Sequence, residues 1–277
     1  MPAQIVAIML VRNEDIYIER VIRNIADFCD KIIITDHRST DRTFKICERL
    51  AGQIAKIDLR QIQSPEESGQ ALEPYFGTDT WIFGVDGDEI YDPQGLKTMR
   101  KLLLEGAFSK DWCIFGNALN VISLDLDKKI AKGHLAPPCR PTSKLYNFSF
   151  IDWWDSGSER LHGEDIKFKD GFSSGLRRYL HTEMPWEEAY FRHLHMPFMK
   201  RSSGQKSSFI KTRLNPNELL KASLEKNWLF KMWRELRVQV SRFLGLDWKN
   251  KKISPRPAGA ERHFPIFSLR LIVASLV

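Results

Sequence analysis

A chain of 277 residues that is 43% hydrophobic and 28% charged has the length and composition of one large globular domain with a smaller appendage. Its four cysteines lack C-x-x-C spacing, so neither a zinc site nor a disulfide framework is indicated, and a reducing compartment such as the cytoplasm is favoured. We expect neither a signal peptide nor a membrane span, which needs ~18 consecutive apolar residues. The formal charge of +7 predicts an anionic partner: nucleic acid, anionic lipid or a phosphorylated sugar donor.

The first hundred residues alternate between apolar runs of strand length and helical patterns. Strands are expected at 4–11, 31–35 and 54–62, and Asn13 is a suitable N-cap for the first helix. The helices place apolar side chains on one face: Ile18, Val21, Ile22 and Ile25 in the first, and Phe44, Ile46, Cys47 and Leu50 in the second. This alternation predicts an α/β fold with a mostly parallel central sheet flanked by helices.

A fourth apolar run, 81–85, ends on acidic residues. Asp86 and Asp88 flank a glycine, and the Asp-Pro pair at 92–93 predicts a helix start. Because ligands of open α/β sheets bind at the carboxyl ends of the strands, Asp36, which follows the second strand, should emerge on the same edge. Two carboxylates one residue apart can converge on Mg²⁺ or Mn²⁺ and so carry a diphosphate. The alternative is an acidic turn with solvated carboxylates.

Phosphate-cradling glycine motifs are missing from the sequence. Neither G-x-G-x-x-G nor G-x-x-x-x-G-K-[ST] occurs. A bound diphosphate would therefore need a metal ion, or Lys and Arg side chains, to balance its charge.

Three segments in register resemble the N-terminal half of the family 2 nucleotide-sugar glycosyltransferases, which have a GT-A fold. The segments are MLVRNED at 9–15, IITDHRSTDRT at 33–43 and VDGDEI at 85–90. The second is similar to the family's D-x-G-S-T-D-G-T stretch, with Arg38 and Arg42 where glycine is usual. The third is similar to its D-x-D metal motif.

The resemblance implies a metal-dependent, inverting glycosyltransferase of the type that builds bacterial cell-surface polysaccharide. Its donor would be a nucleotide-diphosphate sugar, and its acceptor a glycan, lipid-linked or other hydroxyl group. The donor site would include Asn13, Glu14, Asp36, Arg38 and Asp86, while Asp86 and Asp88 would hold Mn²⁺ or Mg²⁺. A divalent ion stabilises the charge that develops on the departing diphosphate, and inversion needs a general base.

The second half supplies candidates for this base. Strands are expected near 112–126 and 148–154, joined by a mobile loop at 128–143. Glu164 and Asp165 resemble the acidic pair that carries the family's base, and a solvated acidic turn is the alternative. Trp153 and Trp154 either stack on an acceptor sugar or belong to the core.

Two late histidines are candidate metal ligands. His181 ends a strand-like segment, and the His-x-Pro element at His195 resembles a family element that is followed by basic residues. Either histidine would complete the metal shell, and Lys200 and Arg201 would contact the donor diphosphate. The alternative is a purely structural histidine.

Beyond residue 215 the composition changes. A basic, Trp-rich amphipathic helix is expected at 226–249, which either lies on an anionic membrane surface or packs on the catalytic domain. We expect a GT-A catalytic domain at 1–215, with a nucleotide-sugar half at 1–110 and an acceptor half at 111–215. A basic helical extension would follow at 216–277, and the protein would be cytoplasmic or peripheral at the inner face of the membrane.

Two other functions compete with this prediction. A nucleotidyltransferase also has carboxylates at strand ends, but the glycine-rich first loop of that class is missing. A catalytically inactive protein of the same fold could bind a membrane or nucleic acid. The intact Asp86 and Asp88 speak against it, and nucleic acid is the less favoured partner.

Overall fold

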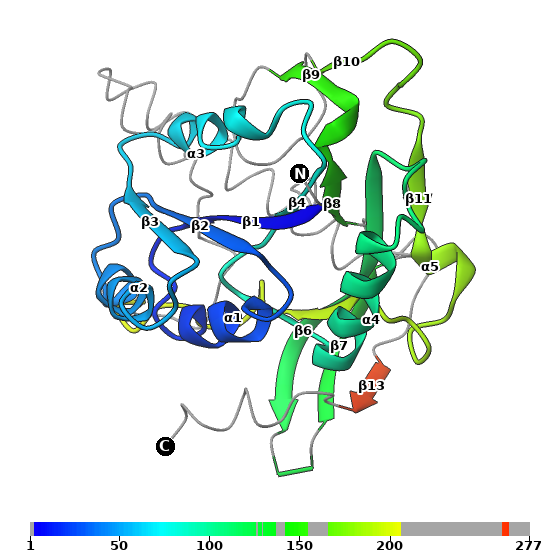
Figure 1. The fold of residues 1–277 in the computed structure, drawn as a ribbon. Coiled ribbons are helices and arrows are strands. Elements are labelled where there is room, and N and C mark those ends of the chain that lie inside the picture. Colours follow the sequence, from blue (N-terminus) through cyan, green and yellow to red (C-terminus); the bar gives the residue numbers. More distant parts are fainter. Residues whose placement is uncertain are drawn as a thin grey trace, which may run out of the picture.

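The computed structural model describes residues 3–125, 127–128, 130–136, 142–154, 166–205 and 262–265. Its N-terminal part is a parallel sheet with the strand order β3-β2-β1-β4, connected by helices (Figure 1). The elements are β1 (Gln4–Val11), α1 (Ile18–Ile25), β2 (Lys31–Asp36), α2 (Thr43–Ala51), β3 (Ile57–Gln61), α3 (Glu66–Gln70), the 3-10 turn η1 (Glu73–Tyr75), β4 (Thr80–Gly84), β5 (Glu89–Tyr91) and α4 (Pro93–Leu104).

Apolar side chains cover both faces of this sheet. In β1, Ile5, Ala7 and Met9 pack with helices α1, α2 and α4 on one face. Val6 and Ile8 pack on the other face, with the chain that follows α3 and with η2 (Phe148–Phe150). Burial on both faces explains why these strands are continuous apolar runs, and it confirms the predicted α/β class.

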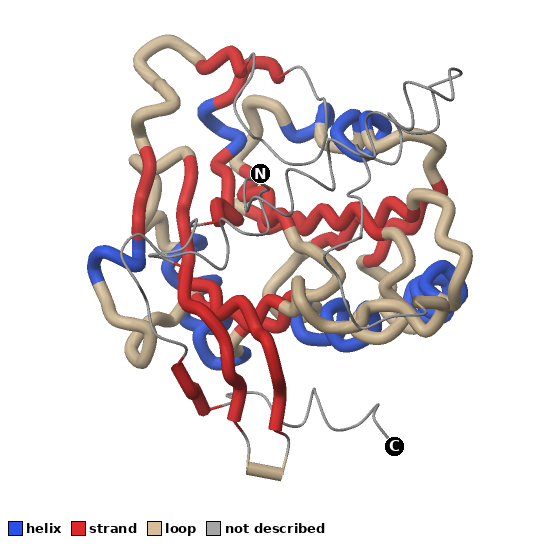
Figure 2. The backbone as a smooth tube through the Cα atoms, turned by 180° about the vertical axis from the view of Figure 1, so that it is seen from behind, coloured by secondary structure: helices blue, strands red, loops and turns tan. Residues whose placement is uncertain are grey.

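The second half extends the sheet with mainly antiparallel neighbours. Strand β8 lies between β4 and β6, β7 pairs with β6, and β12 inserts parallel to β6 and antiparallel to β5. These elements are β6 (Cys113–Asp125), β7 (Ile130–Ala136), β8 (Thr142–Asn147), β9 (Ile151–Trp154), β10 (Ile166–Phe168), β11 (Arg177–Tyr179), α5 (Leu180–Glu183), β12 (Arg192–His195) and β13 (Arg262–Pro265). The β6–β7 hairpin extends beyond the helices, and β13 lies on its outer edge (Figures 1 and 2).

Three local predictions were wrong in whole or in part. The strand expected near 148–154 begins only at Ile151, because 148–150 form the 3-10 turn η2. The loop expected at 128–143 contains strand β7, because Gly133 lets this backbone approach β6 closely: a Cβ there would lie 2.3 Å from the Asn120 carbonyl oxygen. Asn13 does not cap α1, whose N-cap position is Tyr17. The helix start at Asp92 is confirmed, since its carboxylate accepts hydrogen bonds from the amides of Gln94 and Gly95.

Most of the expected extension at 216–277 lies outside the described residues, including the helix predicted at 226–249. Only 262–265 are described there, as a strand. Within the described part of the chain, each helix is too short or too polar to cross a bilayer.

Candidate active site

The loops that follow β1, β2 and β4 meet at the carboxyl edge of the parallel sheet, as the alternation of elements predicts. The segment after β12 closes over them. Its Arg201 carbonyl accepts a hydrogen bond from the Ile16 amide, and the Ser202 hydroxyl donates to Asp41 at 2.6 Å. The Ser203 amide donates to Asp15 at 2.7 Å. Residues about 190 positions apart are therefore fixed side by side at one edge.

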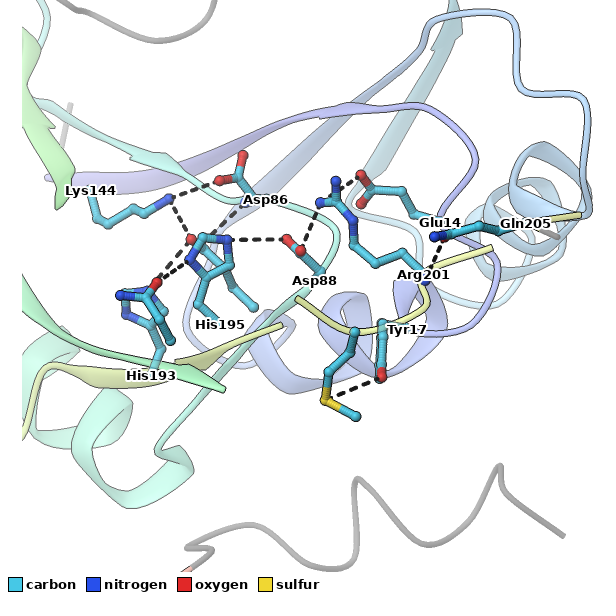
Figure 3. Close-up of polar contacts among 12 residues, drawn as sticks. Glu14, Tyr17, Asp86, Asp88, Lys144, His193, His195, Arg201 and Gln205 are labelled. Carbon is cyan, nitrogen blue, oxygen red and sulfur yellow. Dashed lines mark hydrogen bonds and ion pairs between the residues drawn. The ribbon is translucent and has the colours of Figure 1, made fainter. Parts of the chain in front are cut away.

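Asp86, Asp88 and His195 form a candidate metal centre at this edge (Figure 3). One ligand atom from each lies within 4.8 Å of the other two, and His195 Nε2 is 3.6 Å from Asp88 Oδ1. Asp88 is fully buried, and its Oδ1 has no hydrogen-bond partner among the described residues. A buried carboxylate oxygen without a donor suits a cation, and two carboxylates with one imidazole suit Mn²⁺ or Mg²⁺.

Arg201 contacts the same carboxylates. Its Nη1 lies 2.7 Å from Asp88 Oδ2 and 3.4 Å from Glu14 Oε1 (Figure 3). Burial alone would lower the pKa of Arg201, but Asp88 and Glu14 outweigh it and raise the pKa above the ordinary value. Arg201 is therefore a permanent cation beside the candidate metal position.

A second, deeper group of charges supports Asp86. Glu89 is fully buried, accepts hydrogen bonds from the Asp86 amide at 3.2 Å and the Tyr91 hydroxyl at 3.0 Å, and lies 2.8 Å from Lys144 Nζ. Lys144 also lies 3.6 Å from Asp86 Oδ2. Burial raises the pKa of Glu89, but Lys144 and His193 outweigh it and lower the pKa to about 2.

Carboxylates gather at this edge. Glu14, Asp86, Asp88 and Glu89 contact Lys144 and Arg201, while His193 lies 3.5 Å from Glu89 and His195 lies 3.6 Å from Asp88. Because an uncompensated buried charge is costly, carboxylates held this close together suit a site that binds a cation.

The glycine of the D-x-D segment has a packing role. A Cβ on Gly87 would lie 1.9 Å from Glu14 Oε2, so the Glu14 side chain can take its present position only because residue 87 is a glycine. This contact brings Glu14 next to Asp88 through Arg201.

Four of the predicted donor residues lie where β1 and β2 end: Asp36 is the last residue of β2, and Asn13, Glu14 and Arg38 lie on the loops after the two strands. Asp36 is fully buried, and its Oδ2 accepts the Ser39 amide at 3.0 Å. Asn13 joins the two loops, because its side-chain oxygen accepts the Thr40 amide at 2.7 Å. Arg38 is exposed and has a left-handed backbone with φ 55°. The two loops therefore form one structure beside the metal candidate.

The structure separates the other predicted residues. It brings His195, and not His181, into the described group around Asp86 and Asp88, and His181 lies on α5 against Tyr179. Lys200 is exposed.

Trp154 belongs to the core and Trp153 is 51% exposed. The predicted base residues Glu164 and Asp165 lie outside the described residues.

Lys144 and Asn120 were not found from the sequence. Lys144 follows the segment 128–143 that was expected to be a loop, and Asn120 lies within the strand expected at 112–126. Their nearness to Asp86 and His195 depends on strand pairing across long sequence separations. If β8 had been predicted correctly, the alternation of its side chains between the two faces of the sheet would have been the only sequence signal for the position of Lys144.

Comparisons with known proteins agree with a transferase. No family model matches the chain. It is similar to uncharacterized glycosyltransferases of Rickettsia conorii, Rickettsia felis and Rickettsia bellii, at 20%, 21% and 23% identity over 167 residues. The match covers 60% of this chain and 56%, 56% and 54% of those proteins, so the chain spans about half the length of the curated relatives it matches.

Three solved structures overlap parts of the fold. They are the mannosyltransferase PcManGT of Pyrobaculum calidifontis with GDP-Man and Mn²⁺ (17% identity, 44% of this chain and 36% of that one, TM-score 0.32), 4-diphosphocytidyl-2C-methyl-D-erythritol synthase of Anaerococcus prevotii (13%, 54% and 72%, 0.35), and glucosyl-3-phosphoglycerate synthase of Mycobacterium tuberculosis with phosphoglyceric acid (20%, 43% and 43%, 0.29). These overlaps are partial and concern the fold alone.

Proposed function

We propose that this protein is a metal-dependent, inverting glycosyltransferase that moves a sugar from a nucleotide-diphosphate donor to a hydroxyl acceptor. The observation that carries the proposal is the convergence of Asp86, Asp88 and His195 at the carboxyl edge of the parallel sheet. The relatives named glycosyltransferase, which match 60% of the chain, support the class of reaction.

Each part of the site has a role in this proposal. Asp86, Asp88 and His195 hold Mn²⁺ or Mg²⁺, which when bound supplies positive charge to the departing diphosphate. Arg201, 2.7 Å from Asp88, adds a fixed cation for the same leaving group. Asp36, together with Asn13 and Glu14 on the loop after β1 and Arg38 on the loop after β2, binds the donor. Lys144 balances Glu89 and keeps Asp86 in place.

The acceptor side of the proposal rests on the sequence. Glu164 or Asp165 takes the proton of the acceptor hydroxyl as general base. The acceptor is a glycan or a lipid-linked sugar at the inner face of a membrane, approached by the basic segment at 226–249. A chain truncated before Lys226 should keep donor hydrolysis and lose sedimentation with anionic vesicles; insoluble truncated protein would instead assign the segment to the core.

The decisive experiment uses the full chain and a panel of nucleotide-diphosphate sugars with Mn²⁺ or with EDTA. Chromatography of the products should show a nucleoside diphosphate that disappears with EDTA and in Asp88→Asn. Asp58→Asn is the matched control, because Asp58 lies on β3, away from the candidate site, and its described ion-pair partners are Lys31 of β2 and Arg60 of β3. Release of a sugar 1-phosphate from the donor, or of pyrophosphate when a nucleoside triphosphate and a sugar phosphate are supplied instead, would establish a nucleotidyltransferase and overturn the proposal. Salt-sensitive RNA binding with no thermal shift by any nucleotide sugar would favour an inactive binding protein.

A further inference from the structure

His195 has a buried partner, Asn120, which belongs neither to the D-x-D segment nor to the His-x-Pro element. Asn120 and His195 are register partners on the parallel strands β6 and β12, so their side chains lie on the same face of the sheet. The Asn120 side-chain oxygen is 3.1 Å from His195 Nδ1. The two residues are 2% and 4% exposed. The contact is therefore shielded from water and fixed by the strand pairing.

This contact determines which ring nitrogen of His195 carries the proton. A carboxamide oxygen can only accept a hydrogen bond, so Nδ1 must donate to Asn120. In the neutral imidazole the lone pair then lies on Nε2, the atom that faces Asp88 Oδ1 at 3.6 Å. A histidine binds a metal through that lone pair. The opposite tautomer would direct an N–H group at the carboxylate and prevent ligation.

A purely structural role explains Asn120 poorly. Its Nδ2 is buried without a hydrogen bond in the described part of the chain, and an unpaired buried donor costs about 1–3 kcal/mol. Ala118, two positions earlier and therefore on the same face of β6, is buried and apolar. An apolar side chain at position 120 would avoid this cost, so packing alone does not account for an amide whose oxygen contacts His195 Nδ1.

We propose that Asn120 is a positioning residue of the metal centre, which fixes the His195 tautomer so that Nε2 is available as a ligand beside Asp86 and Asp88. This inference rests on one part of the proposed function, the binding of a metal ion by Asp86, Asp88 and His195. Outer hydrogen-bond partners of this kind typically contribute 10–100-fold to metal affinity, because they orient the ring and raise its basicity. Asn120→Ala should therefore weaken Mn²⁺ binding by about that factor.

The test measures Mn²⁺ binding to the full chain by titration calorimetry, together with the imidazole-nitrogen coupling to Mn²⁺ in pulsed electron paramagnetic resonance. The wild type should bind Mn²⁺ and show the coupling. Asn120→Ala should lose the coupling with its affinity, whereas Asn120→Asp, which keeps an acceptor oxygen, should retain both. If the alanine variant fails to fold, Asn120→Leu has a similar size and also lacks the acceptor.

Asn117→Ala is the matched control. Asn117 is a buried asparagine of the same strand whose side-chain oxygen lacks a hydrogen-bond partner among the described residues, and its register partner is Arg192. This variant should keep the nitrogen coupling and the affinity. Wild-type values in Asn120→Ala and Asn120→Leu would overturn the role of Asn120 while the metal centre stands. A wild type that binds no Mn²⁺ would overturn the metal centre itself, and the inference with it.

Discussion

Replacing Arg201 by alanine should destabilise the metal-free protein and enlarge the stabilisation that it gains from Mn²⁺. Arg201 Nη1 is 2.7 Å from the carboxylate of Asp88, which is fully buried. Removing one partner of a buried ion pair costs about 3–5 kcal/mol. The Arg201 side chain is 17% exposed, so we expect the lower end of this range. At about 2–4 °C per kcal/mol, the melting temperature in EDTA should fall by roughly 6–12 °C.

Added Mn²⁺ should then recover much of this loss. A ligand at a hundred times its dissociation constant stabilises the folded state by about 2.7 kcal/mol, or roughly 5–11 °C here. In the wild type the ion must compete with the guanidinium group for Asp88, so the same addition should raise the melting temperature less. The wild type and Arg201→Ala are compared by differential scanning fluorimetry in EDTA and in a Mn²⁺ series at constant ionic strength.

Arg42→Ala is the control for a general loss of positive charge. Arg42 is also an arginine of the site's edge, but it pairs with Asp15 at 3.1 Å and its side chain is 71% exposed. Its response to Mn²⁺ should equal that of the wild type. The reasoning fails if Mn²⁺ stabilises Arg201→Ala no more than the wild type, because Arg201 would then help to hold the ion instead of competing with it.

Asp86→Asn and Asp88→Asn should each abolish turnover while circular dichroism shows an intact fold; near-native activity in either would contradict the metal assignment. Asp36→Ala should raise the donor KM and leave kcat almost unchanged, since its proposed contact changes little between ground and transition state; steady-state kinetics that show the reverse would assign it another role. Burial raises the pKa of Glu89, but Lys144 outweighs it and the pKa falls to about 2 from an ordinary 4.5. The ionised Glu89 therefore contributes roughly 3 kcal/mol that is present above pH ~4.5 and lost as the pH falls towards 2; denaturant unfolding across this range should show the loss in the wild type and not in Glu89→Gln.

The elements that bear the carboxylates were predictable because their signals are local. The strand at 4–11 is an uninterrupted apolar run buried on both faces, and its predicted bounds equal those of β1. The helix start at Asp92 follows from an N-cap residue and a proline in adjacent positions. The order of strands and helices then places Asp36 and Asp86 at one sheet edge without knowledge of any tertiary contact.

The cations and the positioning amide were not predictable in the same way. Lys144 reaches Glu89 because β8 pairs antiparallel with β4, and Asn120 reaches His195 because β12 inserts beside β6. Both pairings join segments that are distant in sequence. Each also depends on its register, because a shift of one residue would move the side chain to the opposite face of the sheet. The pattern of one sequence indicates which side chains share a face of a strand, but not which strands pair with it. The residues that support the site were therefore found only in the structure.

Arg38 and Arg42, which stand where the similar D-x-G-S-T-D-G-T motif has glycine, differ in their backbone conformation. Arg42 has φ −80°, which any residue adopts, so glycine is not needed there. Arg38 has φ 55°, a left-handed conformation that costs a residue with a Cβ roughly 1–2 kcal/mol relative to glycine. The loop after β2 thus keeps a backbone conformation that favours glycine, although residue 38 is an arginine. The backbone is strained there, and the Arg38 side chain is exposed. Under the proposed function, this retained strain beside buried Asp36 would serve to hold the Arg38 cation against the anionic donor.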